Sequence, residues 1–84
     1  FMNERDRVEK VVKEMLEIPA EGELDHDLFR IGLNSLQFVR LIANLETEFQ
    51  IEFPDEYLIM ENIPTIDDII VYIQNTRPVI RHDG

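Results

Sequence analysis

Apolar residues recur every three to four positions near the beginning of the chain, with charged residues between them. At about 100° per residue, this spacing places the apolar residues on one stripe of a helix and the charges elsewhere. The pattern predicts an amphipathic helix over residues 3–17, which Pro19 and Gly22 bring to an end. The stripe consists of Val8, Val11, Val12, Met15 and Leu16.

A second helical pattern begins at Asn34. This residue fits an N-cap and Gln37 fits the N3 position of a capping box, so Ser35 is the first residue expected to have helical dihedrals. The predicted helix covers residues 35–49. Its core stripe is Phe38, Leu41, Ile42, Leu45 and Phe49.

Three apolar residues of this helix, Leu36, Val39 and Ala43, fall outside the core stripe. They share the outer side of the helix with Arg40 and Glu46. A second apolar patch beside a complete core stripe favours a contact surface. The alternative is that these are tolerated exposed residues, which are common in soluble proteins.

The segments between the helices give weaker signals. A polar loop over residues 21–27 turns apolar at Leu28 and Phe29, and we expect both of these residues to plug the core. Residues 51–53 form one short extended piece without a partner strand, so no sheet is predicted. A short helix is predicted over residues 56–61, because an apolar run there follows acidic residues that favour a first turn.

The last helical pattern follows Pro64. Thr65 fits an N-cap with Asp68 three residues later, and the pattern predicts a helix over residues 65–75. Its stripe is formed by Ile66, Ile69, Ile70 and Ile73.

Three main helices and one short helix, with a long loop before the second, predict a small all-α bundle. We expect a single domain over residues 3–76 and a mobile tail over residues 77–84. Phe1 precedes Met2, and we expect the natural chain to begin at Met2, with Phe1 a remnant of expression.

The amino-acid composition makes several classes of function less plausible. The 84 residues are 44% apolar, which is enough for one core but leaves little room for a deep catalytic cleft. Eight Lys and Arg stand against 18 Asp and Glu, and this net charge of −10 disfavours nucleic acid and membrane surfaces as partners. There is no membrane-spanning run, no signal-peptide pattern and no cysteine, so we expect a cytoplasmic location.

The negative charge is unevenly distributed. Between Leu41 and Thr76 there are eight acidic residues and no Lys or Arg. One interpretation is solubility. The other is a docking surface for basic partners.

Few residues could carry out catalysis. A triad of Ser35, His26 and an aspartate is arithmetically possible, but a hydrolase also needs an oxyanion hole and a substrate cleft. Asp25, His26 and Asp27 could touch a cation, although a solvated acidic loop is the favoured interpretation. We therefore predict that the chain is not an enzyme and holds no metal.

Ser35 is a different kind of candidate. At a helix N-terminus the free amides and the macrodipole favour an anion, so a phosphate group attached to the Ser35 hydroxyl would be tolerated electrostatically. The alternative is that Ser35 is only part of the cap, and the spacing alone does not choose between the two.

Residues 27–36 read DLFRIGLNSL and are followed by LETEF at residues 45–49 and FPDE at residues 53–56. Together these segments resemble the acyl carrier and peptidyl carrier protein family. The resemblance extends from Val8 to Ile73, and it includes the family's Gly-x-Asp-Ser-Leu type of signature ahead of an amphipathic helix.

The resemblance implies that Ser35 is the attachment point of 4′-phosphopantetheine, which a phosphopantetheinyl transferase transfers from coenzyme A. Acyl or aminoacyl groups would then be carried as thioesters from a loading enzyme to downstream transferases or synthases, and the carrier would be a monomer. The family's partner-facing positions correspond here to Asn34, Leu36, Gln37, Val39, Arg40, Ala43 and Glu46.

Four positions depart from the fatty-acid carriers. Asn34 stands where an Asp commonly precedes the serine, and Gln37 and Arg40 occupy positions that are usually acidic. Phe38 faces inward where a small residue often borders the acyl pocket, so we expect long acyl chains to be poorly sequestered. These departures favour a stand-alone carrier in nonribosomal peptide, polyketide or siderophore assembly, or in D-alanyl transfer. The alternatives are a fatty-acid carrier and an unmodified helical interaction module.

Overall fold

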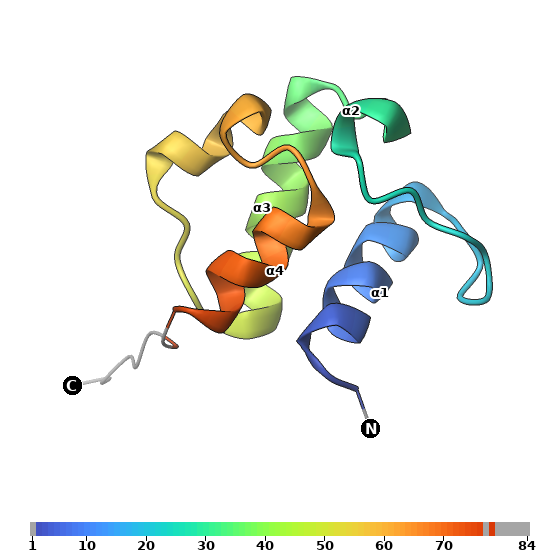
Figure 1. The fold of residues 1–84 in the computed structure, drawn as a ribbon, viewed down its shortest axis with the longest axis horizontal. Coiled ribbons are helices and arrows are strands. Elements are labelled where there is room, and N and C mark those ends of the chain that lie inside the picture. The colour runs from blue at the N-terminus through green and yellow to red at the C-terminus, as the bar shows by residue number, and fades with distance from the viewer. Residues whose placement is uncertain (1, 77, 79–84) are drawn as a thin grey trace.

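A computed structural model describes residues 2–76 and 78, and its regular structure is entirely helical (Figure 1). No strand occurs among these residues, which contain a single isolated bridge between Asp27 and Thr65. The predicted all-α fold is therefore confirmed. The elements are α1 (Glu4–Leu16), α2 (Leu28–Ile31), α3 (Ser35–Phe49), the 3₁₀ segments η1 (Asp55–Leu58) and η2 (Met60–Asn62), and α4 (Ile66–Gln74).

The core lies where α1 packs against both α3 and α4. The predicted stripes of α3 and α4 are buried in full. In α1, Val8 and Val12 are fully buried, while the other three stripe residues pack against the core from its margin. The remaining core residues come from α2 and the connecting segments and are Leu28, Leu33, Ile51, Phe53 and Ile63.

Local capping explains where the helices begin. The Asn3 side chain accepts a hydrogen bond from the Asp6 N–H, and Asn34 and Thr65 form capping boxes with Gln37 and Asp68, as predicted. The predicted ranges 3–17 and 65–75 included the cap residues, so α1 and α4 are each one residue shorter at both ends.

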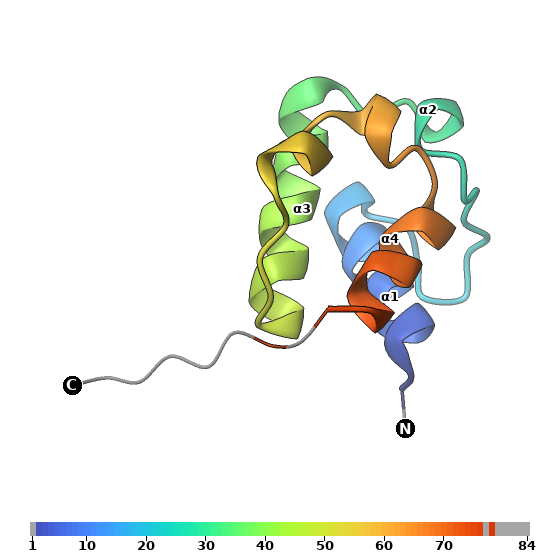
Figure 2. The ribbon, with the colours of Figure 1, turned by 60° about the vertical axis from the view of Figure 1, so that its left-hand side comes forward.

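The segment between α3 and α4 returns along α3 (Figure 2), so that η1 and η2 lie beside the N-terminal end of that helix. The single helix predicted over residues 56–61 is wrong in detail. The backbone becomes extended at Ile59, with φ −108° and ψ 118°, and neither 3₁₀ segment has a side-chain cap. A short run without a cap is more often a 3₁₀ turn than an α-helix.

The loop before α3 contains α2, a helical turn that the sequence pattern did not predict. Leu28 is buried as expected, but Phe29 is 50% exposed, so the expectation that both residues plug the core is wrong. Neighbouring residues on a helical turn point about 100° apart, which prevents both from facing the core.

Within the described part of the chain, no helix combines the length and the apolar character needed to cross a bilayer. Phe1 and the predicted tail, apart from Pro78, lie outside the described residues.

Candidate functional site

The corner between α2 and α3 positions Ser35. Asp27 caps α2 by accepting hydrogen bonds from the Phe29 and Arg30 N–H groups. Gly32 ends α2 in the left-handed conformation, with φ 87°, and its N–H donates to the Leu28 and Phe29 carbonyl oxygens. Leu33 is then buried, with 6% of its surface exposed, and anchors the turn in the core. Ser35 follows as the first residue of α3, a helix of 15 residues.

The hydroxyl of Ser35 is available for reaction. The residue is exposed, and its Oγ has no hydrogen-bond partner among the described residues. All three threonine hydroxyls of the chain, in contrast, donate to another group: Thr47 to the Ala43 carbonyl, Thr65 to the Asp68 carboxylate and Thr76 to the Tyr72 carbonyl. Ser35 is also the only serine in the chain, a signal that the sequence already contained.

The first turn of α3 fits a phosphate ester at Ser35. The Asn34 carboxamide accepts from the Gln37 N–H at 2.8 Å, and the Asn34 N–H donates to the Gln37 side chain at 3.0 Å. The N–H groups of Ser35 and Leu36 find no acceptor within the described ranges, and the first turn contains no acidic residue. Free amides at the positive end of a helix dipole stabilise a phosphate.

A groove of about 540 Å³ lies beside Ser35, between the start of α3 and the η1–η2 segment. It is open to solvent, and the buried ring of Phe38 forms part of its wall. Six of the nine lining residues are apolar, and Glu61 is the acidic member. The lining residues are Phe29, Leu33, Asn34, Ser35, Phe38, Leu58, Ile59, Met60 and Glu61.

Five of the seven exposed large apolar residues in the described chain lie around Ser35. Three of them line the groove, and the other two lie on the first turns of α3, where Leu36 is 67% exposed. We call this set the Ser35 face; its members are Phe29, Leu36, Val39, Leu58 and Ile59. Exposed apolar residues gathered in one place are typical of interaction sites.

The sequence singled out Leu36 and Val39 but missed the other three residues of the Ser35 face. For Phe29 the signal was present, because a capping Asp27 followed by Gly32 marks a short helical turn. For Leu58 and Ile59 it was not, since their place beside Ser35 depends on how the η1 segment folds back along α3.

The predicted partner-binding residues of α3 fall into two groups. Six of them are exposed, although the side chains of Asn34 and Gln37 are engaged in the capping box. Glu46 differs, because it is half-buried and its carboxylate accepts a hydrogen bond from the Phe53 N–H at 2.8 Å. The six exposed residues are Asn34, Leu36, Gln37, Val39, Arg40 and Ala43.

His26 is held away from Ser35. Its Nε2 lies 2.9 Å from a Glu9 carboxylate oxygen and its Nδ1 lies 3.4 Å from an Asp67 oxygen. The structure therefore gives no support to a triad of Ser35 with His26. No group of three or more potential metal ligands gathers in the part of the chain that the structure describes.

The acidic second half is partly neutralised by α1. Arg7 donates to the Glu48 carboxylate at 3.0 Å, and Arg5 donates to Asp67 at 2.8 Å. The Arg5 hydrogen bond is the main cause that lowers the pKa of Asp67 below its ordinary value of 3.8. Two of the eight acidic residues are thus ion-paired, and the negative charge open to a partner is smaller than the sequence suggests.

Comparison with known proteins agrees with the resemblance seen in the sequence. The family described as "Phosphopantetheine attachment site" matches residues 6–73. Tyrocidine synthase 3 from Brevibacillus parabrevis is 31% identical over 70 residues, a segment that covers 83% of this chain and 1% of that protein. The chain therefore corresponds to about one hundredth of the length of this relative.

Proposed function

Because the chain belongs to the phosphopantetheine attachment-site family, whose members carry a covalently attached 4′-phosphopantetheine, we propose that Ser35 is the attachment residue. The observation that carries this proposal is the free Ser35 hydroxyl at the first position of α3, beside two unpaired amides. The attached group supplies a terminal thiol on which acyl or aminoacyl groups are held as thioesters. Carrier domains of this kind are not catalytic themselves.

In the attachment step, Ser35 Oγ forms a bond to the phosphorus that bears the pantetheine in coenzyme A, and the nucleotide portion leaves. The hydroxyl proton passes to a base supplied by the transferase. The chain contributes position rather than proton transfer, since its nearby amides can donate to the phosphate oxygens and His26 is engaged elsewhere.

The carried group and the pathway are a finer part of the proposal. We infer a carrier for nonribosomal peptide assembly or a related specialised pathway such as polyketide, siderophore or D-alanyl transfer. The similarity to a tyrocidine synthase supports the peptide pathway. The neutral or basic residues Asn34, Gln37 and Arg40 around Ser35 make a fatty-acid carrier the weaker alternative.

The transferase, the loading enzyme and the downstream enzymes must all reach Ser35, so we infer that they dock on the Ser35 face. Apolar side chains that are exposed together give up contact with water when a partner covers them, which favours association. We infer that the chain acts as a monomer, because each partner in turn needs this face open. We also infer a cytoplasmic location.

Intact-mass analysis after incubation with coenzyme A and a broad-specificity phosphopantetheinyl transferase tests the proposal. We expect the parent chain to gain the mass of one phosphopantetheinyl group and Ser35→Ala to gain none. Thr47→Ala is a matched control on the same helix and should be modified like the parent. An unmodified parent chain would support the unmodified interaction module instead. A mass gain that persists in Ser35→Ala would show that the group is attached to a different residue.

A further inference from the structure

The outer side of α3 differs in charge from the rest of the chain. Although the net charge is −10, Arg40 is the only charged residue between Ser35 and Leu45. It is exposed and lies next to Val39 of the Ser35 face. The part of the surface that surrounds Ser35 on α3 therefore consists of apolar and uncharged polar residues with one positive charge.

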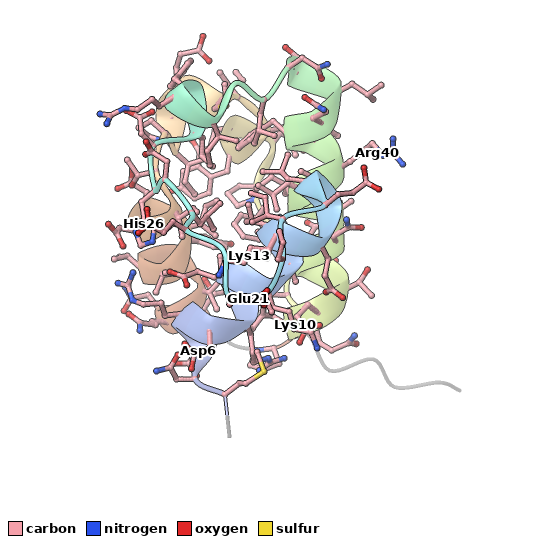
Figure 3. All side chains as sticks on the ribbon, turned by 90° about the vertical axis from the view of Figure 1, so that its right-hand side faces the viewer. Asp6, Lys10, Lys13, Glu21, His26 and Arg40 are labelled. Atoms are coloured by element: carbon pink, nitrogen blue, oxygen red, sulfur yellow. The ribbon has the colours of Figure 1, made fainter. Side chains whose placement is uncertain are left out.

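Arg40 also differs from the other arginines that the structure describes. Arg5, Arg7 and Arg30 each have a carboxylate oxygen within 4.0 Å, at 2.8 Å, 3.0 Å and 3.6 Å. Arg40 has none within that distance in residues 2–76 and 78. Figure 3 shows its side chain projecting from α3 away from the helical body.

The nearest acid along the outer side of α3 does not neutralise Arg40. Glu46 is six residues further along the helix, and its carboxylate is committed to the Phe53 N–H. An exposed guanidinium without an internal partner, beside exposed apolar side chains, is suited to pair with an anion on a docking protein. Its planar donors match a carboxylate in a bidentate arrangement.

We propose that the phosphopantetheinyl transferase that modifies Ser35 places a carboxylate against Arg40 when it docks beside Leu36 and Val39. This inference rests on the proposed function, because it assumes that the transferase docks on the Ser35 face. A transferase surface that is basic opposite Arg40 is repelled at this point, so the residue selects partners by charge.

Charge reversal at Arg40 tests the inference through the steady-state kinetics of modification by the broad-specificity transferase. We expect Arg40→Glu to raise KM and so lower kcat/KM about 10-fold, and Arg40→Ala to lower kcat/KM about 3-fold. Arg40→Lys should lose less than Arg40→Ala but not match the parent, because it keeps the charge and loses the planar donors. The deficit of Arg40→Glu should shrink as salt is raised, because exposed charges are screened.

Lys10→Glu is the matched control. Lys10 is exposed on α1, and its reversal changes the net charge by the same amount as Arg40→Glu. We expect it to leave kcat/KM within about 2-fold of the parent. Equal losses in both variants, or an Arg40→Glu chain modified as fast as the parent, would overturn the inference while the proposed function stands. A parent chain that is not modified at all would overturn the proposed function instead.

Discussion

The carboxylate of Glu46 accepts a hydrogen bond from the backbone N–H of Phe53, with 2.8 Å between Oε2 and N. Ile51 and Phe53 are both buried, so this bond holds the extended segment after α3 against the helix while its side chains enter the core. The same segment leads to η1 and thus to Leu58 and Ile59 of the Ser35 face. Glu46 therefore supports the shape of the Ser35 face from within the fold.

We expect Glu46→Ala to lower the free energy of unfolding by about 1–2 kcal/mol, because a partly buried amide loses a charged acceptor. Glu46→Gln should lose less, since its amide oxygen can still accept. Urea denaturation measures both effects. If Glu46→Ala were as stable as the parent but were loaded more slowly by the true partner enzyme, the partner-binding role predicted from the sequence would be right.

Measuring both the stability and the rate of modification also distinguishes the role of Val39 from that of Glu46. Val39 is 40% exposed and makes little contribution to the core. We expect Val39→Asp to slow modification of Ser35 several-fold while the free energy of unfolding stays within about 0.5 kcal/mol, as for most surface substitutions. Circular dichroism checks that the helical content is unchanged. A variant that is modified at the parental rate would show that the docking surface does not include this residue.

The features that the sequence predicted are those determined by residues close together in the chain. The two capping boxes each join residues three positions apart, and the core stripes of α3 and α4 follow directly from the helical period. Ser35 could be assigned to the start of α3 for the same reason. Ser35 is also the only serine in the chain, so the sequence offers no other serine hydroxyl for attachment.

The features that the sequence did not predict depend on how distant segments meet. The pairs of Arg7 with Glu48 and of His26 with Glu9 join segments that are far apart in the sequence, and no local sequence pattern predicts them. The role of Glu46 was missed for a related reason, since a helical wheel shows which side a residue faces but not that a returning segment covers it. The free hydroxyl of Ser35 is likewise visible only once every other hydrogen bond is placed.

Asp67 should make the stability of the protein depend on pH under acidic conditions. Its pKa is lowered in the folded state, chiefly by the hydrogen bond from Arg5 and further by the nearby His26. A carboxylate with a lowered pKa stabilises the fold above its ordinary pKa of 3.8, and this contribution is lost as the pH falls through the folded-state value. Because the pair is exposed, we expect less than about 1 kcal/mol.

The variant Asp67→Asn tests this dependence. Near neutral pH the parent should be slightly more stable than the variant in urea denaturation, and the difference should shrink as the pH falls below 3.8. A difference that stayed constant over this range would mean that Asp67 acts through packing or helix capping rather than through its charge.

Gly32 should be sensitive to substitution for conformational reasons alone. Its φ of 87° lies in the left-handed region, yet a Cβ added there would meet nothing within 4 Å. We therefore expect Gly32→Ala to lower the free energy of unfolding by about 1 kcal/mol, and Gly32→Asn by less, because Asn tolerates this conformation better. Equal stability of Gly32→Ala and the parent in urea would show that the turn before Ser35 relaxes without strain.

Phe38 should prevent the core from taking up a long acyl chain. Its ring is only 1% exposed and closes the inner wall of the groove beside Ser35, so a chain entering there would have to displace packed side chains. If the carrier is modified as proposed, its Tm with a long acyl group should lie within about 2 °C of its Tm with an acetyl group. In Phe38→Leu, which leaves more room, the long group should stabilise the protein relative to acetyl. Strong stabilisation of the parent by the long acyl group in a thermal melt would show that the core opens despite Phe38.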